Sequence, residues 1–303
     1  MTPVAYTQPA SLEPSIMLER SRPVVAVGID AGSTTCKALA VDDRGQTVAW
    51  SLAQTSPRIE DQTRATLETF RRTCGFDSAI PVFATGYGRK LVPAADRNVT
   101  EITCHARGVF ADTATAGTLI DIGGQDSKVI RIGADGAVVD FAMNDKCAAG
   151  TGRFLERTAQ SLGVALDDIG ATALSAPRAA IITSTCTVFA ESEIISLLAH
   201  GVPVDEILLG LHQSLVSRIL ALLHGVGLVP PLMLSGGVAR NSAIVELLGR
   251  QSGQKVRMPS HPQLMGAYGA ALLAAHQAGD DVKATDVPAA ARDGCSDCQA
   301  PTT

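Results

Sequence analysis

The sequence predicts an α/β fold built from two similar halves, and three observations support this prediction. Each half opens with a strand, a glycine-containing turn and two further strands, and helices follow in both halves. The two openings begin near Val24 and Thr118, and a third glycine-containing turn follows a later strand near Leu234. The repeated pattern indicates an internal duplication, and a cleft between look-alike halves is a common place for ligands to bind.

The composition is that of a globular chain. Hydrophobic residues make up 46% and charged residues 18% of the 303 positions, enough for one large domain or two of about 150 residues. A net charge of −5 gives no electrostatic basis for nucleic-acid binding. The sequence has no uninterrupted apolar run of about 18 residues and no signal-peptide core at its start, so we expect a cytoplasmic protein. Seven cysteines, an odd number, favour thiols over a disulfide framework.

Residues 1–22 are rich in chain breakers and lack periodicity, which predicts a flexible arm. The first half follows at residues 23–116. In this half, short runs of apolar and β-branched residues alternate with turn residues such as those at 43–45, which is typical of hairpins. The predicted strands are Val24–Asp30, Cys36–Asp42, Thr47–Ala53 and Ile80–Ala84, and the predicted helices are Glu60–Cys74 and His105–Thr115.

The second half, residues 117–278, repeats the hairpin pattern with a turn at 133–136 and then becomes mainly helical. Residues 279–303 predict a disordered tail. The predicted strands are Thr118–Ile122, Ser127–Ile132, Ala137–Met143 and Leu232–Leu234, and the predicted helices are Thr151–Leu162, Val188–His200, Val204–His224, Asn241–Gln251 and Gly266–His276.

Three turns carry residues suited to a nucleotide. In the first, glycine lets the backbone approach a phosphate, the hydroxyls add hydrogen bonds, and the aspartate can hold Mg²⁺ through water. Taken alone, such a turn is equally an ordinary hairpin, but a second turn repeats its design at the matching place in the second half. A third turn would suit an adenosine. The candidate residues are Asp30, Gly32, Ser33, Thr34 and Thr35 in the first turn, Asp121, Gly123, Gly124 and Gln125 in the second, and Gly236 and Gly237 in the third.

No Walker sequence occurs, and the three matched glycine turns instead resemble the actin-like fold of the acetate and sugar kinase, heat-shock protein and actin superfamily. That resemblance implies ATP bound between two actin-like halves, with the first turn on the terminal phosphates and the third on the nucleoside. Asp30 and Asp121 would position Mg²⁺ and the attacking water, and Gln125 is a candidate for orienting that water. Phosphoryl transfer needs mainly placement and charge neutralisation, so this small set suffices.

Two cysteines lie directly before predicted helices, Cys147 in the segment 144–153 and Cys186 in the segment 184–191. Helix N-termini stabilise anions and lower thiol pKa values, which suits thiolate ligands of an iron–sulfur cluster. Two thiolates are half of the four that a 4Fe–4S cluster usually takes, so a cluster shared across a twofold axis would need one pair from each subunit. Packing as small hydrophobic residues is an open alternative, and it is the interpretation we favour for Cys36, Cys74 and Cys104.

Several segments together resemble the activators (component A) of 2-hydroxyacyl-CoA dehydratases and, equally, the ATPase subunits of ATP-dependent benzoyl-CoA reductase. The resemblance extends over Val24 to Gln277. Glu101 and His105 lie within it, although a helix-start glutamate and an interfacial histidine explain them as well. The segments that carry it are residues 84–89, 104–106, 121–126, 144–156 and 186–193.

The resemblance implies a dimer that holds one 4Fe–4S cluster between its subunits, with Cys147 and Cys186 as the ligands from this chain. It also implies ATP and Mg²⁺ in each subunit, and a second subunit that is identical or homologous. The electron acceptor would be an acyl-CoA reductase or dehydratase component, and the donor a ferredoxin or flavodoxin. The pair Cys295 and Cys298 lies beyond the resemblance and predicts no metal site, since two ligands cannot close one.

We expect an ATP-hydrolysing iron–sulfur protein that delivers low-potential electrons to a CoA-thioester enzyme. An ATPase subunit of benzoyl-CoA reductase is the first hypothesis, because many arginines and alanines hint at a GC-rich bacterial genome. A separate homodimeric activator of a 2-hydroxyacyl-CoA dehydratase is the alternative. A small-molecule kinase of the same superfamily is a more remote hypothesis. A non-catalytic module is disfavoured because Asp30 and Asp121 are both present.

Overall fold

The computed structural model describes residues 15–76, 80–144, 150–183 and 187–277. These residues form two compact units. Unit 1 contains the described residues up to Val99 and those from Ala270 onward, and unit 2 contains the described residues between Thr100 and Gly269. The chain therefore leaves unit 1 after its sixth strand and returns to it within its last helix.

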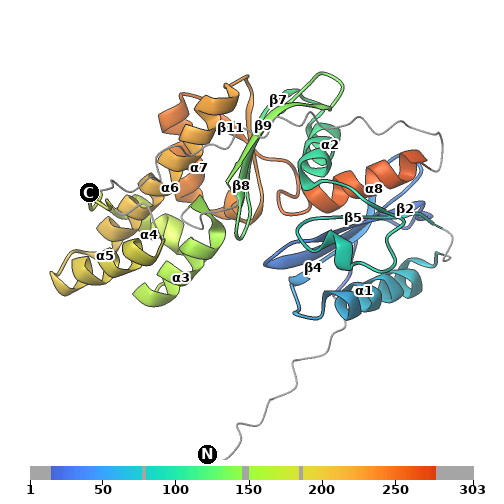
Figure 1. Ribbon diagram of the computed structural model, residues 1–303, viewed down its shortest axis with the longest axis horizontal. Coiled ribbons are helices and arrows are strands. Elements are labelled where there is room, and N and C mark those ends of the chain that lie inside the picture. Colours follow the sequence, from blue (N-terminus) through green and yellow to red (C-terminus); the bar gives the residue numbers. More distant parts are fainter. Residues whose placement is uncertain (1–14, 77–79, 145–149, 184–186, 278–303) are drawn as a thin grey trace, which may run out of the picture. The chain divides into compact units, whose positions relative to one another are not determined.

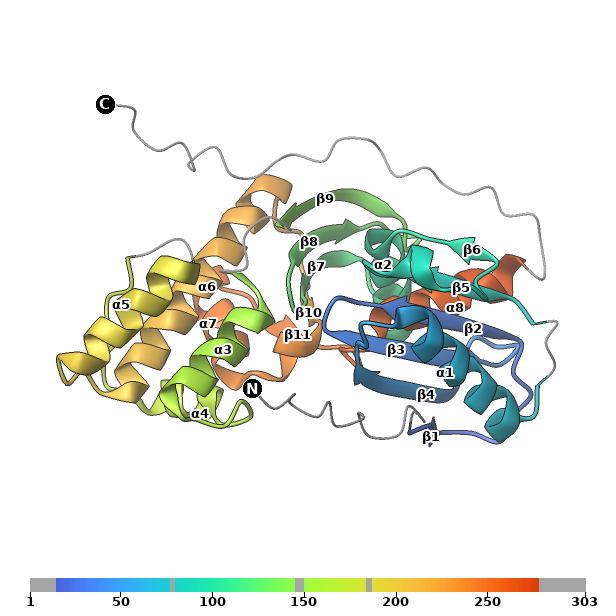
Figure 2. The same ribbon diagram turned by 60° about the horizontal axis from the view of Figure 1, so that its bottom comes forward.

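Unit 1 is built on a six-stranded sheet in the order β1-β4-β3-β2-β5-β6 (Figure 2). Strands β2, β3 and β4 form an antiparallel meander, and β5 lies parallel to β2 on its other side. The turn that links β3 to β4 is closed by Asp42, whose carboxylate accepts hydrogen bonds from the backbone of Arg44 and Gln46. The strands are β1 (Met17–Leu18), β2 (Ala26–Ala31), β3 (Thr35–Val41), β4 (Thr47–Gln54), β5 (Val82–Thr85) and β6 (Arg97–Asn98).

Helix α1 (Ile59–Cys74) covers this sheet and closes the core of unit 1. Its apolar face brings Leu67 and Phe70 against Val27 and Ile29 of β2. All four side chains are buried, so the burial of large apolar groups holds the helix on the sheet. The helix ends at Gly75, which adopts the left-handed conformation that caps many helices.

Unit 2 repeats the strand arrangement in a five-stranded sheet with the order β11-β10-β7-β8-β9, labelled in Figure 2 and seen from another side in Figure 1. Strands β7, β8 and β9 form an antiparallel meander, and β10 lies parallel to β7. Strand β7 therefore occupies the place of β2, and β10 that of β5, which confirms the predicted duplication. The strands are β7 (Gly117–Ile122), β8 (Ser127–Ile132), β9 (Val138–Asn144), β10 (Leu232–Ser235) and β11 (Val256–Arg257).

Both faces of the unit 2 sheet are covered by helices, because side chains along a strand point alternately to either face. Leu119 of β7 packs in a cluster with Val109 of α2 (Glu101–Thr113). Its neighbour Ile120 packs on the opposite face with Leu211 of α6 (Val204–Val226). Strand β7 therefore carries apolar side chains toward both layers of helices.

The remaining helices of unit 2 share one apolar cluster with α6. They are α3 (Gly152–Leu162), α4 (Ile169–Ser175), α5 (Thr187–Ala199) and α7 (Ser242–Ser252), and α8 (Met265–Gln277) ends the described chain. Two short 3₁₀ segments, η1 (Arg89–Leu91) and η3 (Gly237–Arg240), follow β5 and β10. In the described part of the chain, α6 alone is long and apolar enough to cross a membrane. More than half of its most apolar stretch is buried within unit 2, which identifies it as a core helix.

The α/β fold is the one that the sequence predicts, and the differences are local. Helix α2 begins at Glu101 instead of His105, because the Thr100 side chain caps it by accepting a hydrogen bond from the Thr103 backbone N–H. Helix α4, which has seven residues, is not predicted, since so short a segment carries little periodicity. The two-residue edge strands β1, β6 and β11 are missed for the same reason.

Within unit 2, helices α2 and α8 cross so closely that Gly269 is required at the crossing. A Cβ atom on Gly269 would overlap the carbonyl oxygen of Cys104, and backbone atoms cannot swing aside as a side chain can. We therefore predict that Gly269→Ala lowers the free energy of unfolding by about 1–3 kcal/mol or more, measured by denaturant unfolding.

Gly225→Ala is the matched control. This glycine lies in the last turn of α6 with no atom within 4 Å of an added Cβ. The better helix propensity of alanine should stabilise the protein by roughly 0.5–1 kcal/mol there. Equal effects of the two substitutions would contradict a close crossing at Gly269.

Candidate functional site

The two sheets place the same three kinds of side chain in one row across three strands. In unit 1, strand pairing aligns Thr85 with Asp30 and Asp30 with Lys37. In unit 2, it aligns Ser235 with Asp121 and Asp121 with Lys128. Because directly paired residues project from the same face of a sheet, each row brings a hydroxyl, a carboxylate and an ammonium group together beside a glycine turn.

In the unit 1 row, Lys37 Nζ lies 3.0 Å from a carboxylate oxygen of Asp30, and both side chains are largely buried. The turn that follows Asp30 holds Gly32, whose carbonyl accepts a 2.7 Å hydrogen bond from the Thr55 hydroxyl. The buried hydroxyls of Thr34 and Thr85 have no hydrogen-bond partner among the described residues. Unpaired buried hydroxyls beside a lysine are suited to the oxygens of a phosphate.

In the unit 2 row, Asp121 is fully enclosed by polar partners. Its Oδ1 accepts a 2.7 Å hydrogen bond from the Ser235 hydroxyl and lies 3.2 Å from His105 Nδ1, while its Oδ2 lies 3.4 Å from Lys128 Nζ. Burial alone would raise the pKa of the Asp121 carboxyl, but the charges of His105 and Lys128 and the hydrogen bonds outweigh it and hold this pKa well below its usual range. The Asp121 carboxylate is therefore ionised at neutral pH.

Lys128 is surrounded by carboxylates from three elements. Besides Asp121 on β7, its Nζ lies 2.7 Å from Asp126 in the turn and 3.1 Å from Glu101 at the start of α2. Burial alone would lower the pKa of Lys128, but the three carboxylate charges outweigh it and raise this pKa above its ordinary value. The ammonium therefore stays charged although the side chain is 2% exposed.

The second glycine turn also anchors the helix that follows the Cys147 segment. The carbonyl of Gly123 accepts a 2.9 Å hydrogen bond from the Gly152 N–H, and the carbonyl of Gly124 accepts a 2.8 Å bond from the Arg153 N–H. These donors belong to the first turn of α3, which leaves them without partners inside the helix. The turn and α3 are thus joined through main-chain atoms, and Gln125 lies exposed at the tip of the turn.

The third turn is held against the second by Gly236, which has φ of 88°. A Cβ atom there would overlap the carbonyl of Ile122 at the end of β7, so glycine is required by both conformation and space. Beyond η3, the Asn241 side chain caps α7 by accepting hydrogen bonds from the Ala243 and Ile244 N–H groups. Its amide nitrogen lies 2.9 Å from Nε2 of the buried His212.

The predicted site residues fall into three places. Asp30, Gly32, Ser33, Thr34 and Thr35 lie in unit 1, and Asp121, Gly123, Gly124, Gln125, Gly236 and Gly237 lie in unit 2, where the second and third turns adjoin. Cys147 and Cys186 lie outside the described residues, as do Cys295 and Cys298. Cys36 and Cys104 are buried in the cores, and burial raises the pKa of the Cys36 thiol to about 12.

Sequence reasoning missed both lysines of the two rows. A usable signal was present, because each lysine follows its aspartate by seven residues in both hairpins. A tight hairpin places such residues opposite each other, so the repeated spacing predicts two cross-strand ion pairs. The hydroxyls of Thr85 and Ser235 come from parallel strands distant in sequence, and no local pattern indicates them.

The helices that follow the two predicted cluster ligands lie next to each other. Arg157 of α3 and Glu191 of α5 form an ion pair of 3.6 Å. Within α5, the Glu193 carboxylate accepts hydrogen bonds from the backbone and hydroxyl of Thr183, which ties Thr183 to this helix. Helices α3 and α5 therefore contact each other within unit 2.

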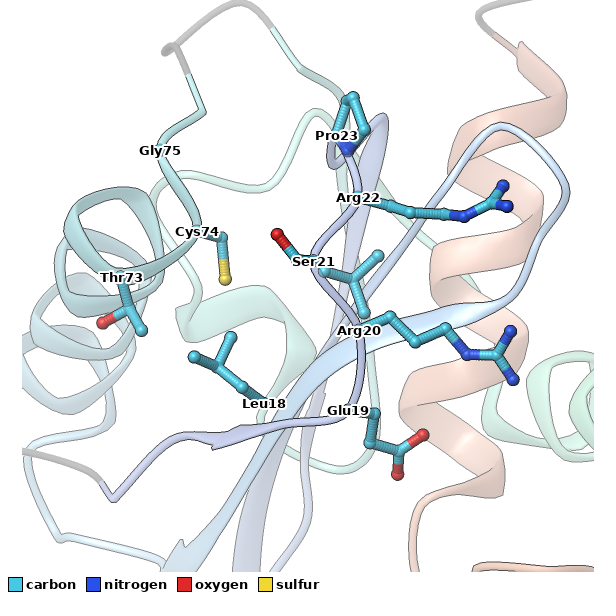
Figure 3. Close-up of a pocket in the computed structure, with 10 residues that line it drawn as sticks. Leu18, Glu19, Arg20, Ser21, Arg22, Pro23, Thr73, Cys74 and Gly75 are labelled. Carbon is cyan, nitrogen blue, oxygen red and sulfur yellow. The ribbon is translucent and has the colours of Figure 1, made fainter.

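Unit 1 also contains an open cavity of about 590 Å³ that none of the predicted site residues lines. It lies between residues 18–23 and the end of α1, with the Cys74 thiol and the Ser21 hydroxyl turned into it, while Arg20 and Arg22 extend away (Figure 3). Residues 18–23 reach this position because β1 pairs with β4. The cavity is therefore separate from the glycine turns.

Two matching sheets, each with a glycine turn and an aspartate–lysine pair, give the chain the actin-like fold that is typical of ATPases. The chain belongs to the BadF/BadG/BcrA/BcrD ATPase family, whose model matches residues 27–274.

Several relatives are named as activators of CoA-ester dehydratases. The chain is 38% identical over 258 residues to the 2-hydroxyisocaproyl-CoA dehydratase activator of Clostridioides difficile, which covers 85% of this chain and 97% of that protein. It is 42% identical over 249 residues to the activator of lactoyl-CoA dehydratase of Anaerotignum propionicum, which covers 82% and 96%. The structure of the first activator with bound ADPNP superposes with a TM-score of 0.78 over 86% of this chain and 99% of that one.

A benzoyl-CoA reductase subunit of Thauera aromatica is also similar, at 31% identity over 265 residues, which covers 83% of this chain and 93% of that protein. The dehydratase activators are more similar to the chain than this reductase subunit is. The comparisons therefore favour the dehydratase activator, the alternative hypothesis from the sequence, over the reductase subunit that we placed first.

His212, which contacts Asn241 just beyond the third turn, makes the free energy of unfolding depend on pH. Its Nδ1 lies 2.7 Å from the Leu208 carbonyl, so Nδ1 carries the hydrogen and Nε2 accepts from Asn241. Burial lowers the pKa of His212, which the two hydrogen bonds offset in part. Below about pH 6.5 the unfolded chain then binds a proton that the folded chain does not, so stability falls as the pH drops, by at most about 1.4 kcal/mol per pH unit.

We predict that His212→Gln flattens this slope, measured as the free energy of unfolding between about pH 5 and 7. Glutamine can still accept from Asn241 but does not titrate. His224→Gln, an exposed position on the same helix, serves as the control and should keep the slope of the wild type. An identical slope in His212→Gln and the wild type would refute the assignment.

Proposed function

We propose that the protein is an ATP-hydrolysing activator that passes low-potential electrons to a 2-hydroxyacyl-CoA dehydratase. The observation that carries the proposal is the main-chain link between the second glycine turn and α3. A nucleotide-dependent change at Gly123 and Gly124 would be transmitted directly to the helix that follows Cys147. The names of the relatives support the choice of a dehydratase as the partner.

ATP and Mg²⁺ fit the residues of the two rows. Lys37 and the hydroxyls of Thr34 and Thr85 would bind phosphate oxygens, since the hydroxyls are buried without partners in the described chain. Asp121 is held ionised, as a carboxylate that positions Mg²⁺ and water must be. Asp30 is the second aspartate proposed to hold Mg²⁺, Gln125 would orient the attacking water, and Gly236 and Gly237 would contact the nucleoside.

The electron-carrying site is proposed at Cys147 and Cys186. Both precede helices, and the pair Arg157–Glu191 ties these helices together, so two thiolates from one chain could reach a common centre. A 4Fe–4S cluster completed by the same two cysteines of a second chain would supply a one-electron redox centre. The positive end of each helix would stabilise the thiolates.

The proposal includes a homodimer in the cytoplasm that is reduced by a ferredoxin or flavodoxin and docks reversibly on the dehydratase. A permanent component of a benzoyl-CoA reductase is the second candidate, supported by the similarity to the reductase subunit of Thauera aromatica. A permanent component would copurify with its partner, whereas an activator would be active when added separately in small amounts.

The first test measures iron and acid-labile sulfide in protein purified without oxygen. We predict about four irons per dimer in the wild type and a loss of most of them in Cys147→Ala and in Cys186→Ala, because either substitution removes two of the four thiolates of the shared cluster. Cys74→Ala is the control, since this thiol lies in the separate cavity. A colourless wild type that still hydrolyses ATP would overturn the electron-transfer proposal.

The second test adds the purified protein, a reductant and MgATP to a 2-hydroxyacyl-CoA dehydratase component that has been freed of its own activator. Dehydration that requires ATP hydrolysis and is lost with Cys147→Ala is the expected result. Activity with a benzoyl-CoA reductase core in place of the dehydratase would select the second candidate.

A further inference from the structure

Three carboxylates in unit 2 face one point, and an ammonium group occupies it. Lys128 Nζ lies 2.7 Å from Asp126, 3.1 Å from Glu101 and 3.4 Å from Asp121. An ammonium has three N–H groups, so each has one carboxylate partner. Asp126 lies in a turn, Glu101 at the start of α2 and Asp121 near the end of β7, so Lys128 links three separate elements.

The equivalent place in unit 1 is simpler. Lys37 pairs with Asp30, but the residue two positions before it is Thr35, where unit 2 has Asp126. Unit 2 therefore gathers additional acidic groups around its lysine, although one carboxylate is enough to neutralise a lysine. This surplus of negative charge points to a role beyond pairing the lysine.

The geometry suits a lysine better than a metal ion. Divalent Mg²⁺ needs oxygens at about 2.0–2.1 Å, whereas the three carboxylates stand at 2.7–3.4 Å from their common point. In the described part of the chain, no group of three or more His, Cys, Asp or Glu side chains is placed to hold a metal ion. Glu101 and Asp126 are each 23% exposed, so they could close on a smaller ion if the lysine were absent.

We propose that Lys128 is a positioning residue that holds Glu101, Asp121 and Asp126 in place and keeps divalent cations out of this cluster until the nucleotide brings one. The inference rests on the proposed hydrolysis of ATP at the second turn. Lys128 touches no reacting atom in this mechanism. It acts through the carboxylates by setting their separation and by neutralising part of their charge.

The test measures Mn²⁺ binding to the nucleotide-free, full-length protein by electron paramagnetic resonance. Lys128→Met should bind Mn²⁺ roughly tenfold or more tightly than the wild type, because three carboxylates then face a vacated point without a counter-charge. Lys255→Met removes one positive charge from the same unit and should leave Mn²⁺ binding unchanged. In MgATP hydrolysis, Lys128→Met should lose roughly 10–100-fold in kcat, with the KM for ATP within about threefold of the wild type.

A second variant covers the case in which Lys128→Met does not fold. Lys128→Met combined with Asp126→Asn removes one charge of each sign, so the cluster keeps its net charge while its centre is vacated. Tighter Mn²⁺ binding than the wild type and a lowered kcat would support the proposal. Unchanged Mn²⁺ affinity and unchanged kcat in whichever variant folds would overturn it. A wild type that hydrolyses no ATP would instead remove the proposed function, and the Mn²⁺ comparison would still decide the role of Lys128.

Discussion

A buried charge must be paired, and this constraint shapes the centre of both units. Removing one partner of a buried ion pair costs about 3–5 kcal/mol, so such pairs are held where they form. In each unit the aspartate and lysine lie directly opposite each other at the hairpin end, which fixes the register of the two strands. The glycine turn between them is then positioned by the same pairing. The same strand register that pairs the aspartate with the lysine therefore also places the glycine turn of the site.

The two units have similar folds, but their rows of side chains differ in chemistry. Both carry a hydroxyl, a carboxylate and an ammonium in register, but their surroundings differ. In unit 1 the hydroxyls of Thr34 and Thr85 lack partners among the described residues, beside a largely buried pair of Lys37 and Asp30. In unit 2 the aspartate has partners on both oxygens, from β10, α2 and β8. One row is suited to binding and the other to holding a carboxylate in a fixed orientation.

Much of the fold could be predicted because hairpin signals are local. The meanders of both halves follow from apolar runs and turn residues, and the seven-residue spacing of aspartate and lysine was available although it went unused. Other features depend on tertiary structure. Glu101 meets Lys128 only because α2 packs on the unit 2 sheet, and the short helix α4 has too few residues to show a period. The glycine turns followed from the repeated hairpin pattern, and the family resemblance is confirmed over residues 27–274. The two candidate partner enzymes were ranked on a weak compositional hint, and the comparisons favour the alternative.

The bonds from Gly152 and Arg153 to the second turn involve only peptide groups. Three of the four residues are glycines, and a Cβ atom on Gly123 would overlap the Asp126 carboxylate, so the linkage constrains these positions. Side chains elsewhere on the turn and the helix can change without breaking it. In the proposed mechanism, a set of proteins that keeps these glycines could vary its docking surface for different acyl-CoA enzymes, and a change of partner would require no new internal linkage.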